Sequence, residues 1–283
     1  MTIRKSDLAG SWYPATAAEC EKSIIEFQKQ IDVRNTSTKM PIGGIVPHAG
    51  WYFSGHIACN VFRFLKEGPL PEVIIVFGLH LHASSPACIM QSGAWETPFG
   101  PVVIAEDFAT RLMEKYNFGG VGARSFANDN TIEVQLPFLK YYFGDAKFVP
   151  IGVPPNADAI KIGTAVAETA SELKTSLRVI GSTDLTHYGD NYGFAPAGRG
   201  AAAVDWVVNQ SDPKVIAAMQ AMQPEQVLTE AASSHNACCA GAVAAALCAG
   251  KALGADKAHP LAYATSHDKN PGESFVGYVG LVF

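Results

Sequence analysis

The chain has 283 residues, of which 48% are hydrophobic and 17% are charged. This composition is typical of a globular protein and excludes the disordered and fibrous classes. With 21 basic and 26 acidic residues the net charge is −5, so we expect neither nucleic acid nor an anionic membrane as a partner. The length suits an α/β protein that stays undivided, and we predict a single domain over residues 1–283.

The first residues carry two basic side chains with no apolar segment after them, so they do not resemble a secretory signal. The most membrane-like stretch, residues 237–249, is short and rich in Ala and Gly, and we interpret it as a buried helix. Six cysteines are too few for a disulfide framework in a chain of this length. The sequence therefore predicts a cytoplasmic protein with reduced thiols.

Strand-like and helix-like segments alternate along the chain. Short, continuous apolar runs predict strands buried on both faces, at Gly43–Val46, Val73–Phe77, Lys147–Val153, Arg178–Ile180, Leu261–Ala264 and Phe275–Phe283. Helices are predicted at Ala17–Gln30, His56–Leu65, Ala157–Leu173, Arg199–Asn209, Pro213–Ala221, Pro224–Glu230 and Ala237–Ala249. This alternation is typical of a three-layer α/β/α fold around a mixed, mostly parallel sheet.

In folds of this kind, ligands bind outside the carboxyl ends of the strands. Polar residues that directly follow a predicted strand are therefore candidates for a functional site. Four such loops hold five of the eight histidines, namely His48, His80, His82, His187 and His267. We predict that the site lies at this edge of the sheet.

The first two loops carry three of these histidines. His48 lies between Pro47 and a glycine-containing turn, which suits a fixed metal ligand or base. His80 and His82 alternate around Leu81, so in an extended segment both would point to one face. Both imidazoles could then share one metal site, or one could be a ligand and the other a polar residue at the rim.

The loop after the predicted strand Arg178–Ile180 carries a carboxylate and an imidazole. Asp184 lies three residues before His187. A carboxylate at this spacing can orient an imidazole as a general acid or base, or support a metal ligand from behind. The alternative is an Asp184 that caps a helix beside a histidine in solvent.

Two adjacent cysteines, Cys238 and Cys239, are predicted at the start of an Ala-rich helix whose N-cap comes from residues 233–236. The positive end of a helix favours the thiolate, which binds metals or attacks substrates. The other four cysteines are expected to be buried apolar residues. Glu133 is a further candidate, because a carboxylate among apolar residues is costly to bury unless it is paired.

The sequence lacks the short motifs of several enzyme classes. It contains no P-loop, no H-E-x-x-H, no G-x-S-x-G and no C-x-x-C, so ATP hydrolysis, zincin, α/β-hydrolase and thioredoxin-like chemistry lose support. What remains is a His/His/Cys or His/His/carboxylate set at strand ends. Mixed imidazole and thiolate ligands favour Fe(II), Cu or Zn over Mg or Ca.

Several segments resemble the Memo family, also called AmmeMemoRadiSam system protein B, in both order and spacing. They are Gly10–Pro14, Pro47–Trp51, Gly78–His82, Thr131–Pro137, Ser182–Gly189 and the Cys238 helix. The resemblance covers nearly the whole chain. It implies a fold similar to the catalytic B subunit of class III extradiol ring-cleaving dioxygenases, which hold a non-haem Fe(II) with two histidines and a glutamate.

The resemblance also implies a set of metal ligands. Carried over residue by residue, these are His48, then His80 with His82 as the alternative, and Cys238 with Cys239 as the alternative. Fe(II) is the expected metal, with Cu or Zn as alternatives.

Other pocket residues follow from the same resemblance. It implies that His187 is the acid or base and that Asp184 is its orienting partner or an extra metal contact. An aromatic wall would be formed by Trp12, Tyr13 and Phe53. Asn130 departs from the family pattern, which often has histidine there, so a titratable group is missing from the pocket rim.

Two functions fit these observations. One is a dioxygenase-like, non-haem metal-dependent oxidoreductase that acts on a small molecule. The other is a metal-binding, redox or protein-interaction module without turnover, although few clustered basic residues are present to hold a phosphopeptide. In either case distant side chains must converge, and we expect the His48 imidazole within about 8 Å of a thiol of Cys238 or Cys239.

Overall fold

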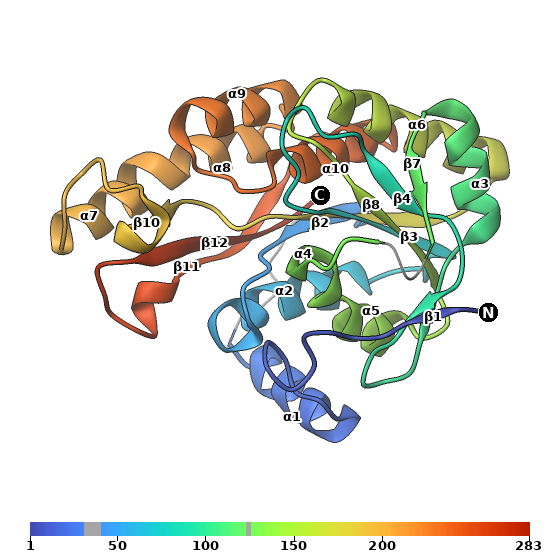
Figure 1. Ribbon diagram of the computed structural model, residues 1–283, viewed down its shortest axis with the longest axis horizontal. Coiled ribbons are helices and arrows are strands. Elements are labelled where there is room, and N and C mark those ends of the chain that lie inside the picture. Colours follow the sequence, from blue (N-terminus) through green and yellow to red (C-terminus); the bar gives the residue numbers. More distant parts are fainter. Residues whose placement is uncertain (31–40, 123–125) are drawn as a thin grey trace.

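The computed structural model describes residues 1–30, 41–122 and 126–283 (Figure 1). Its main sheet consists of β2 (Gly43–Val46), β3 (Val73–Gly78), β4 (Cys88–Met90), β7 (Gly119–Val121), β8 (Lys147–Gly152), β9 (Leu177–Ser182), β10 (His187–Tyr188), β11 (His259–Thr265) and β12 (Phe275–Val282). The strand order is β10-β12-β2-β9-β3-β8-β4-β7, and β11 also pairs with β12.

The main sheet is parallel at its centre and mixed toward its edges. Strands β2, β9, β3 and β8 run parallel to one another, whereas β12 pairs with β2 and β4 pairs with β8 in the antiparallel sense. All six residues of β3 are buried, as expected for a strand covered on both faces. A small second sheet joins β1 (Ile3–Arg4), β5 (Ala94–Trp95) and β6 (Val102–Val103).

Helices cover both faces of the main sheet (Figure 1). One face carries α3 (Glu106–Lys115), α6 (Asp158–Leu173), α8 (Asp212–Gln220), α9 (Pro224–Ser234) and α10 (Ala240–Ala252). The other carries α1 (Ala17–Gln28), α2 (Trp51–Leu65), α4 (Asn130–Glu133) and α5 (Leu136–Phe143). The predicted α/β architecture, with helices on both sides of a mixed sheet, is confirmed.

Several predicted helices differ from the observed ones. The helix predicted at His56–Leu65 begins earlier, at Trp51, and the helix predicted at Pro224–Glu230 extends to Ser234. The segment predicted as one helix at Arg199–Asn209 is divided into α7 (Ala201–Trp206) and a π-helical turn, Val207–Ser211. The Ala-rich helix predicted from Ala237 begins at Ala240. Within the described ranges no helix has both the length and the apolar character needed to cross a membrane.

Close packing of α10 fixes the position of the chain segment that precedes it. A methyl group added to Gly163 of α6 would lie 2.5 Å from the carbonyl oxygen of Ala245 in α10. On the sheet side, a methyl group on Gly181 of β9 would lie 3.1 Å from the carbonyl oxygen of Ala242. Because α10 is built mainly from Ala and Gly, it approaches both α6 and the sheet closely, which holds residues 238 and 239 at the carboxyl end of β9.

We expect Gly163→Ala to lower the free energy of unfolding by about 1–3 kcal/mol, because the new methyl group overlaps the α10 backbone. Gly119→Ala is the matched control, since its methyl group would have a neighbour no nearer than 3.6 Å. Urea unfolding followed by circular dichroism measures both. Equal stability of the two variants would show that α6 and α10 do not pack as tightly as described.

Candidate metal centre

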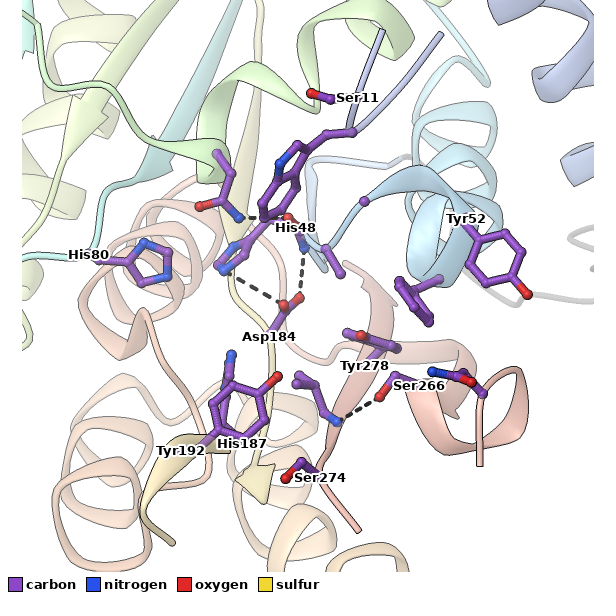
Figure 2. Close-up of a pocket in the computed structure, with 17 residues that line it drawn as sticks. Ser11, His48, Tyr52, His80, Asp184, His187, Tyr192, Ser266, Ser274 and Tyr278 are labelled. Atoms are coloured by element: carbon purple, nitrogen blue, oxygen red, sulfur yellow. Dashed lines mark hydrogen bonds and ion pairs between the residues drawn. The ribbon is translucent and has the colours of Figure 1, made fainter. Parts of the chain in front are cut away.

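The carboxyl ends of three neighbouring parallel strands bring the predicted residues together. His48 follows β2, His80 follows β3, and Asp184 follows β9. Figure 2 shows the side chains of these three residues lying close to one another around a common space. The segment before α10 adds Cys238 to the same place, since the Cys238 backbone N–H donates to the Asp184 carbonyl oxygen at 3.1 Å.

The protonation of the His48 ring follows from its hydrogen bonds. Ser182 donates its hydroxyl hydrogen to the Thr131 carbonyl oxygen at 2.6 Å, so the Ser182 oxygen accepts from His48 Nδ1 at 3.1 Å. Nδ1 therefore carries a proton. The other nitrogen, Nε2, lies 3.2 Å from the sulfur of Cys238. Burial opposes a charged ring, but Asp184 and Cys238 raise the pKa of His48, so in the metal-free protein Nε2 donates a proton toward the sulfur. The Nε2 lone pair becomes available to a metal ion when that proton leaves.

The His80 ring is held in the same way by a carboxylate. Its Nδ1 lies 2.9 Å from an oxygen of Asp129, and this oxygen also accepts the His80 backbone N–H at 3.1 Å. The hydrogen bond that His80 donates to the Asp129 carboxylate raises the pKa of His80 to about 10. Because Nδ1 is engaged by Asp129, Nε2 is the nitrogen available to the sulfur of Cys238 or to a metal ion.

The turn before His80 has an unusual backbone. Leu79 has φ +68°, a left-handed conformation that is uncommon for residues other than glycine. Its backbone N–H donates to the Thr131 hydroxyl oxygen at 2.8 Å, which holds the turn in place. Strained residues of this kind cluster at functional sites.

Cys238 is stabilised as a thiolate. Its sulfur accepts the Asp184 backbone N–H at 3.3 Å and lies 3.9 Å from the sulfur of Cys239. Burial opposes ionisation of Cys238, but the hydrogen bond from Cys239 and the adjacent His48 ring outweigh it and hold the pKa of the Cys238 thiol well below its usual value. Burial raises the pKa of the Cys239 thiol, so Cys239 is the neutral member of the pair.

These side chains form a compact donor cluster. One ligand atom from each of His48, His80, Cys238 and Cys239 lies within 4.8 Å of the others. Cys239 is the least suited of the four, because its thiol is directed to the carbonyl oxygen of Leu79 at 3.7 Å. The cluster can bind a metal ion, and two imidazoles with a thiolate are donors suited to a first-row transition metal.

Of the two roles that the spacing left open for Asp184, the hydrogen bonds favour support of His48 over orientation of His187. Asp184 Oδ1 accepts the His48 backbone N–H at 2.7 Å, and its Oδ2 lies 3.9 Å from His48 Nε2. Burial raises the pKa of Asp184. His187 instead donates from Nδ1 to the Leu185 carbonyl oxygen at 3.1 Å, because the strand β10 turns its ring toward Tyr192, with 4.9 Å between ring centroids.

A cavity of about 620 Å³, which we call the main cavity, opens onto His48 and His80. Its wall includes the predicted aromatic residues Trp12 and Phe53 together with Tyr52, Tyr192 and Tyr278 (Figure 2). Hydroxyl and amide groups complete the lining at Ser11, Asn130, Ser266, Asn270 and Ser274. The mixture of aromatic faces and neutral polar groups suits a small organic molecule.

Three predicted site residues lie elsewhere. Tyr13 is 3% exposed and donates its hydroxyl to Glu133 Oε1 at 3.0 Å, so it belongs to the core and not to the pocket wall. Glu133 also accepts the backbone N–H groups of Asp7 and Leu8 at 2.9 and 2.7 Å, which makes it an anchor for the N-terminal segment. His82 is exposed and pairs with Ser84, 2.8 Å from Nδ1, outside the cluster.

The start of α10 also differs from prediction. Ser233 and Ser234 end α9 and do not cap α10, because the chain reverses through His235 in a left-handed conformation. Cys239 itself occupies the capping position of α10. The thiolate of Cys238 is therefore stabilised mainly by its neighbours and not by the helix end.

Asp129 and Ser182 contact the rings of His80 and His48, and sequence reasoning did not single them out as supports for these histidines. Asp129 caps α4 by accepting the Thr131 backbone N–H at 2.8 Å. An Asp directly before the first residue of a short helix is a recognisable capping signal. That signal locates Asp129 in the fold, but its second contact, to His80, is visible only in three dimensions.

Comparisons with known proteins identify a family for this chain. The family described as Memo-like protein matches residues 4–282. A MEMO1 family protein of Pyrococcus furiosus is 32% identical over 289 residues, covering 99% of this chain and 98% of that protein. Another, of Methanopyrus kandleri, is 35% identical over 294 residues with the same two coverages, 99% and 98%.

The fold is shared with an uncharacterized protein from Escherichia coli K12 whose structure is solved. The superposition has a TM-score of 0.54 and 13% sequence identity, covering 87% of this chain and 100% of that one. At this identity the match concerns the fold alone.

In the metal-free protein, Asp129→Asn should bring the pKa of His80 from about 10 down toward its ordinary value of 6.5, because an amide does not stabilise the imidazolium. NMR titration of the His80 ring measures this. The raised pKa means that the ion pair stabilises the fold fully below pH 6.5 and ceases to do so as the pH rises through about 10. The stability difference between wild type and variant should shrink over that range, and a wild-type His80 that titrates near 6.5 would contradict the assignment.

Proposed function

The chain belongs to the Memo-like family, and from this membership and the site geometry we propose that it holds one transition-metal ion between His48, His80 and Cys238. We further propose that the protein is a non-haem oxidoreductase acting on a small molecule in the main cavity. One observation carries the metal site: both imidazoles are fixed through Nδ1 and present Nε2 toward the same sulfur.

This arrangement is the one expected around a metal ion. Metal-binding histidines commonly donate their second ring N–H to a carboxylate or another acceptor, which sets the tautomer and the ring direction. Asp129 is the acceptor for the His80 ring, and Ser182 is the acceptor for the His48 ring. The backbone N–H of Asp184 at 3.3 Å from the Cys238 sulfur supports a thiolate at the third position.

Fe(II) is the metal we propose, with Cu or Zn as alternatives. Three protein ligands leave coordination positions for a substrate. When bound, Fe(II) would supply the one-electron and dioxygen chemistry that side chains lack. A thiolate in place of the glutamate of extradiol dioxygenases makes the donor set softer, so the reaction need not be the one that those enzymes catalyse.

His187 is the side chain placed to move a proton in the main cavity. Because Nδ1 donates to the Leu185 carbonyl, Nε2 is the nitrogen of the neutral ring that can accept a proton from a bound molecule. Asp184 fixes the backbone of His48 and so keeps that ligand in position. Trp12 and Phe53 line the cavity beside the cluster, where their apolar faces reduce the access of water.

Metal analysis of anaerobically purified protein tests the ligand set. Wild type should contain close to one transition-metal ion per chain. His48→Ala or Cys238→Ser should lower the metal affinity by more than the roughly 10–100-fold typical of losing a residue that only supports a ligand. The metal content of both variants should therefore fall well below one ion per chain. His82→Ala is the matched control, since it removes an exposed imidazole outside the cluster, and Cys239→Ser tests the second thiol. Metal content that is equal in wild type and His48→Ala would refute the site.

Turnover is tested on protein loaded anaerobically with Fe(II) and then mixed with oxygen. Oxygen consumption is followed with a panel of catechols and other small phenols. His187→Gln should lower the rate by about 10²–10⁴-fold, the usual effect of losing a general acid or base, while the metal content stays unchanged. A loaded protein that neither turns over nor binds any of these compounds would argue for a metal-binding or interaction module without catalysis.

A further inference from the structure

A second cavity of about 590 Å³, which we call the side cavity, reaches the same cluster from the sulfur side. It shares His80, His187 and Tyr192 with the main cavity, so the ring pair of His187 and Tyr192 lies on the border of both. It adds Cys238, which is not among the described residues that line the main cavity. The cluster is therefore accessible from two directions.

The chemical character of the side cavity differs from that of the main cavity. Its described lining consists of His80, His187, Tyr192, Gly193, Phe194, Ala231, His235, Ala237 and Cys238. Within this lining no Asp, Glu, Lys or Arg is present, so the groups that could bind a cation are three imidazoles and a thiolate. Such donors favour transition-metal ions over Mg²⁺ and Ca²⁺, which prefer oxygen ligands.

His235 presents an imidazole to the side cavity. It is an exposed residue, and its ring packs against Phe194 with 5.4 Å between centroids. Among the described residues its ring nitrogens have no hydrogen-bond partner, so they are free to bind a ligand.

The backbone around His235 is fixed although the side chain is exposed. His235 ends α9 with φ +52° and ψ +36°, and its backbone N–H donates to the Ala231 carbonyl at 3.0 Å. The next residue, Asn236, is fully buried and donates its side-chain amide to the Ser211 carbonyl oxygen at 3.0 Å. The imidazole therefore has a defined place three residues before Cys238.

We propose that the side cavity is the route by which the metal ion enters and leaves the centre, with His235 as a transient ligand. The proposal rests on the metal site proposed above. The imidazole of His235 would take the place of one water of the hydrated ion, and His80 and Cys238 would then take the place of His235, with the Nε2 proton of His80 passing to solvent. Because the route approaches the sulfur, loading does not require the main cavity to be empty.

Anaerobic stopped-flow mixing with Co(II) tests the route, because ligation by a thiolate gives cobalt a strong near-ultraviolet absorption. His235→Asn removes the imidazole, and asparagine tolerates the left-handed backbone at this position. We expect association and dissociation rates to fall together, each on the order of tenfold, as for a transition state that has lost one contact. The final absorption spectrum and the equilibrium Kd should be unchanged.

Three further variants separate the routes. Ala231→Phe narrows the side cavity without altering a donor atom and should also slow loading. Ser11→Trp narrows the main cavity, and His82→Asn removes an exposed imidazole elsewhere; both should load at the wild-type rate. Three results would each overturn the route while leaving the metal site intact. The first is a wild-type loading rate in both His235→Asn and Ala231→Phe. The second is an equal slowing of loading by Ser11→Trp, and the third is a weaker equilibrium Kd in His235→Asn. A wild-type protein without the cobalt–thiolate absorption would overturn both.

Discussion

The contact between His48 Nε2 and the sulfur of Cys238, 3.2 Å apart across 190 residues of sequence, is the interaction on which the site depends. It exists because β2 carries His48 to one edge of the sheet and the small residues of α10 let that helix lie close to β9. A buried imidazole beside a part-buried thiolate is unfavourable unless the two charges compensate each other. The fold therefore supports, at some expense of stability, a pair of donors that a metal ion would neutralise.

Much of this arrangement follows from the sequence. Continuous apolar strands alternating with helices predict the sheet, and the rule that ligands bind at strand ends selects the loops of His48, His80 and Asp184. Spacing along the sequence does not predict side-chain contacts between residues that are far apart in the chain. The helices between β3 and β8 are not predicted from the sequence, although Phe108, Ala109 and Leu112 of α3 are buried at helical spacing. Tyr13 joins the core because Glu133, 120 residues away, accepts its hydroxyl. Asp184 and His187 are close in sequence, yet the turn into β10 directs them to different partners.

The sequence left two pairs of alternatives open, His80 or His82 and Cys238 or Cys239, and the members of each pair differ in their hydrogen bonds. His80 is anchored by Asp129, whereas His82 is exposed beside Ser84. Cys238 contacts His48, whereas Cys239 is directed to a carbonyl oxygen. Neither difference is visible in the residue pattern, because the members of each pair are adjacent or nearly adjacent and identical in chemistry. Only the directions imposed by the neighbouring backbone separate them.

The three consecutive residues Asp129, Asn130 and Thr131 support both His48 and His80, each through a different contact. Asp129 holds the His80 ring, Asn130 donates its side-chain amide to the His48 carbonyl oxygen at 2.8 Å, and the Thr131 carbonyl orients Ser182, which holds the His48 ring. One short segment, residues 129–131, therefore supports both histidines. A shift of this segment would move both rings together, so the distance between the two rings would change less than their distance from the Cys238 sulfur.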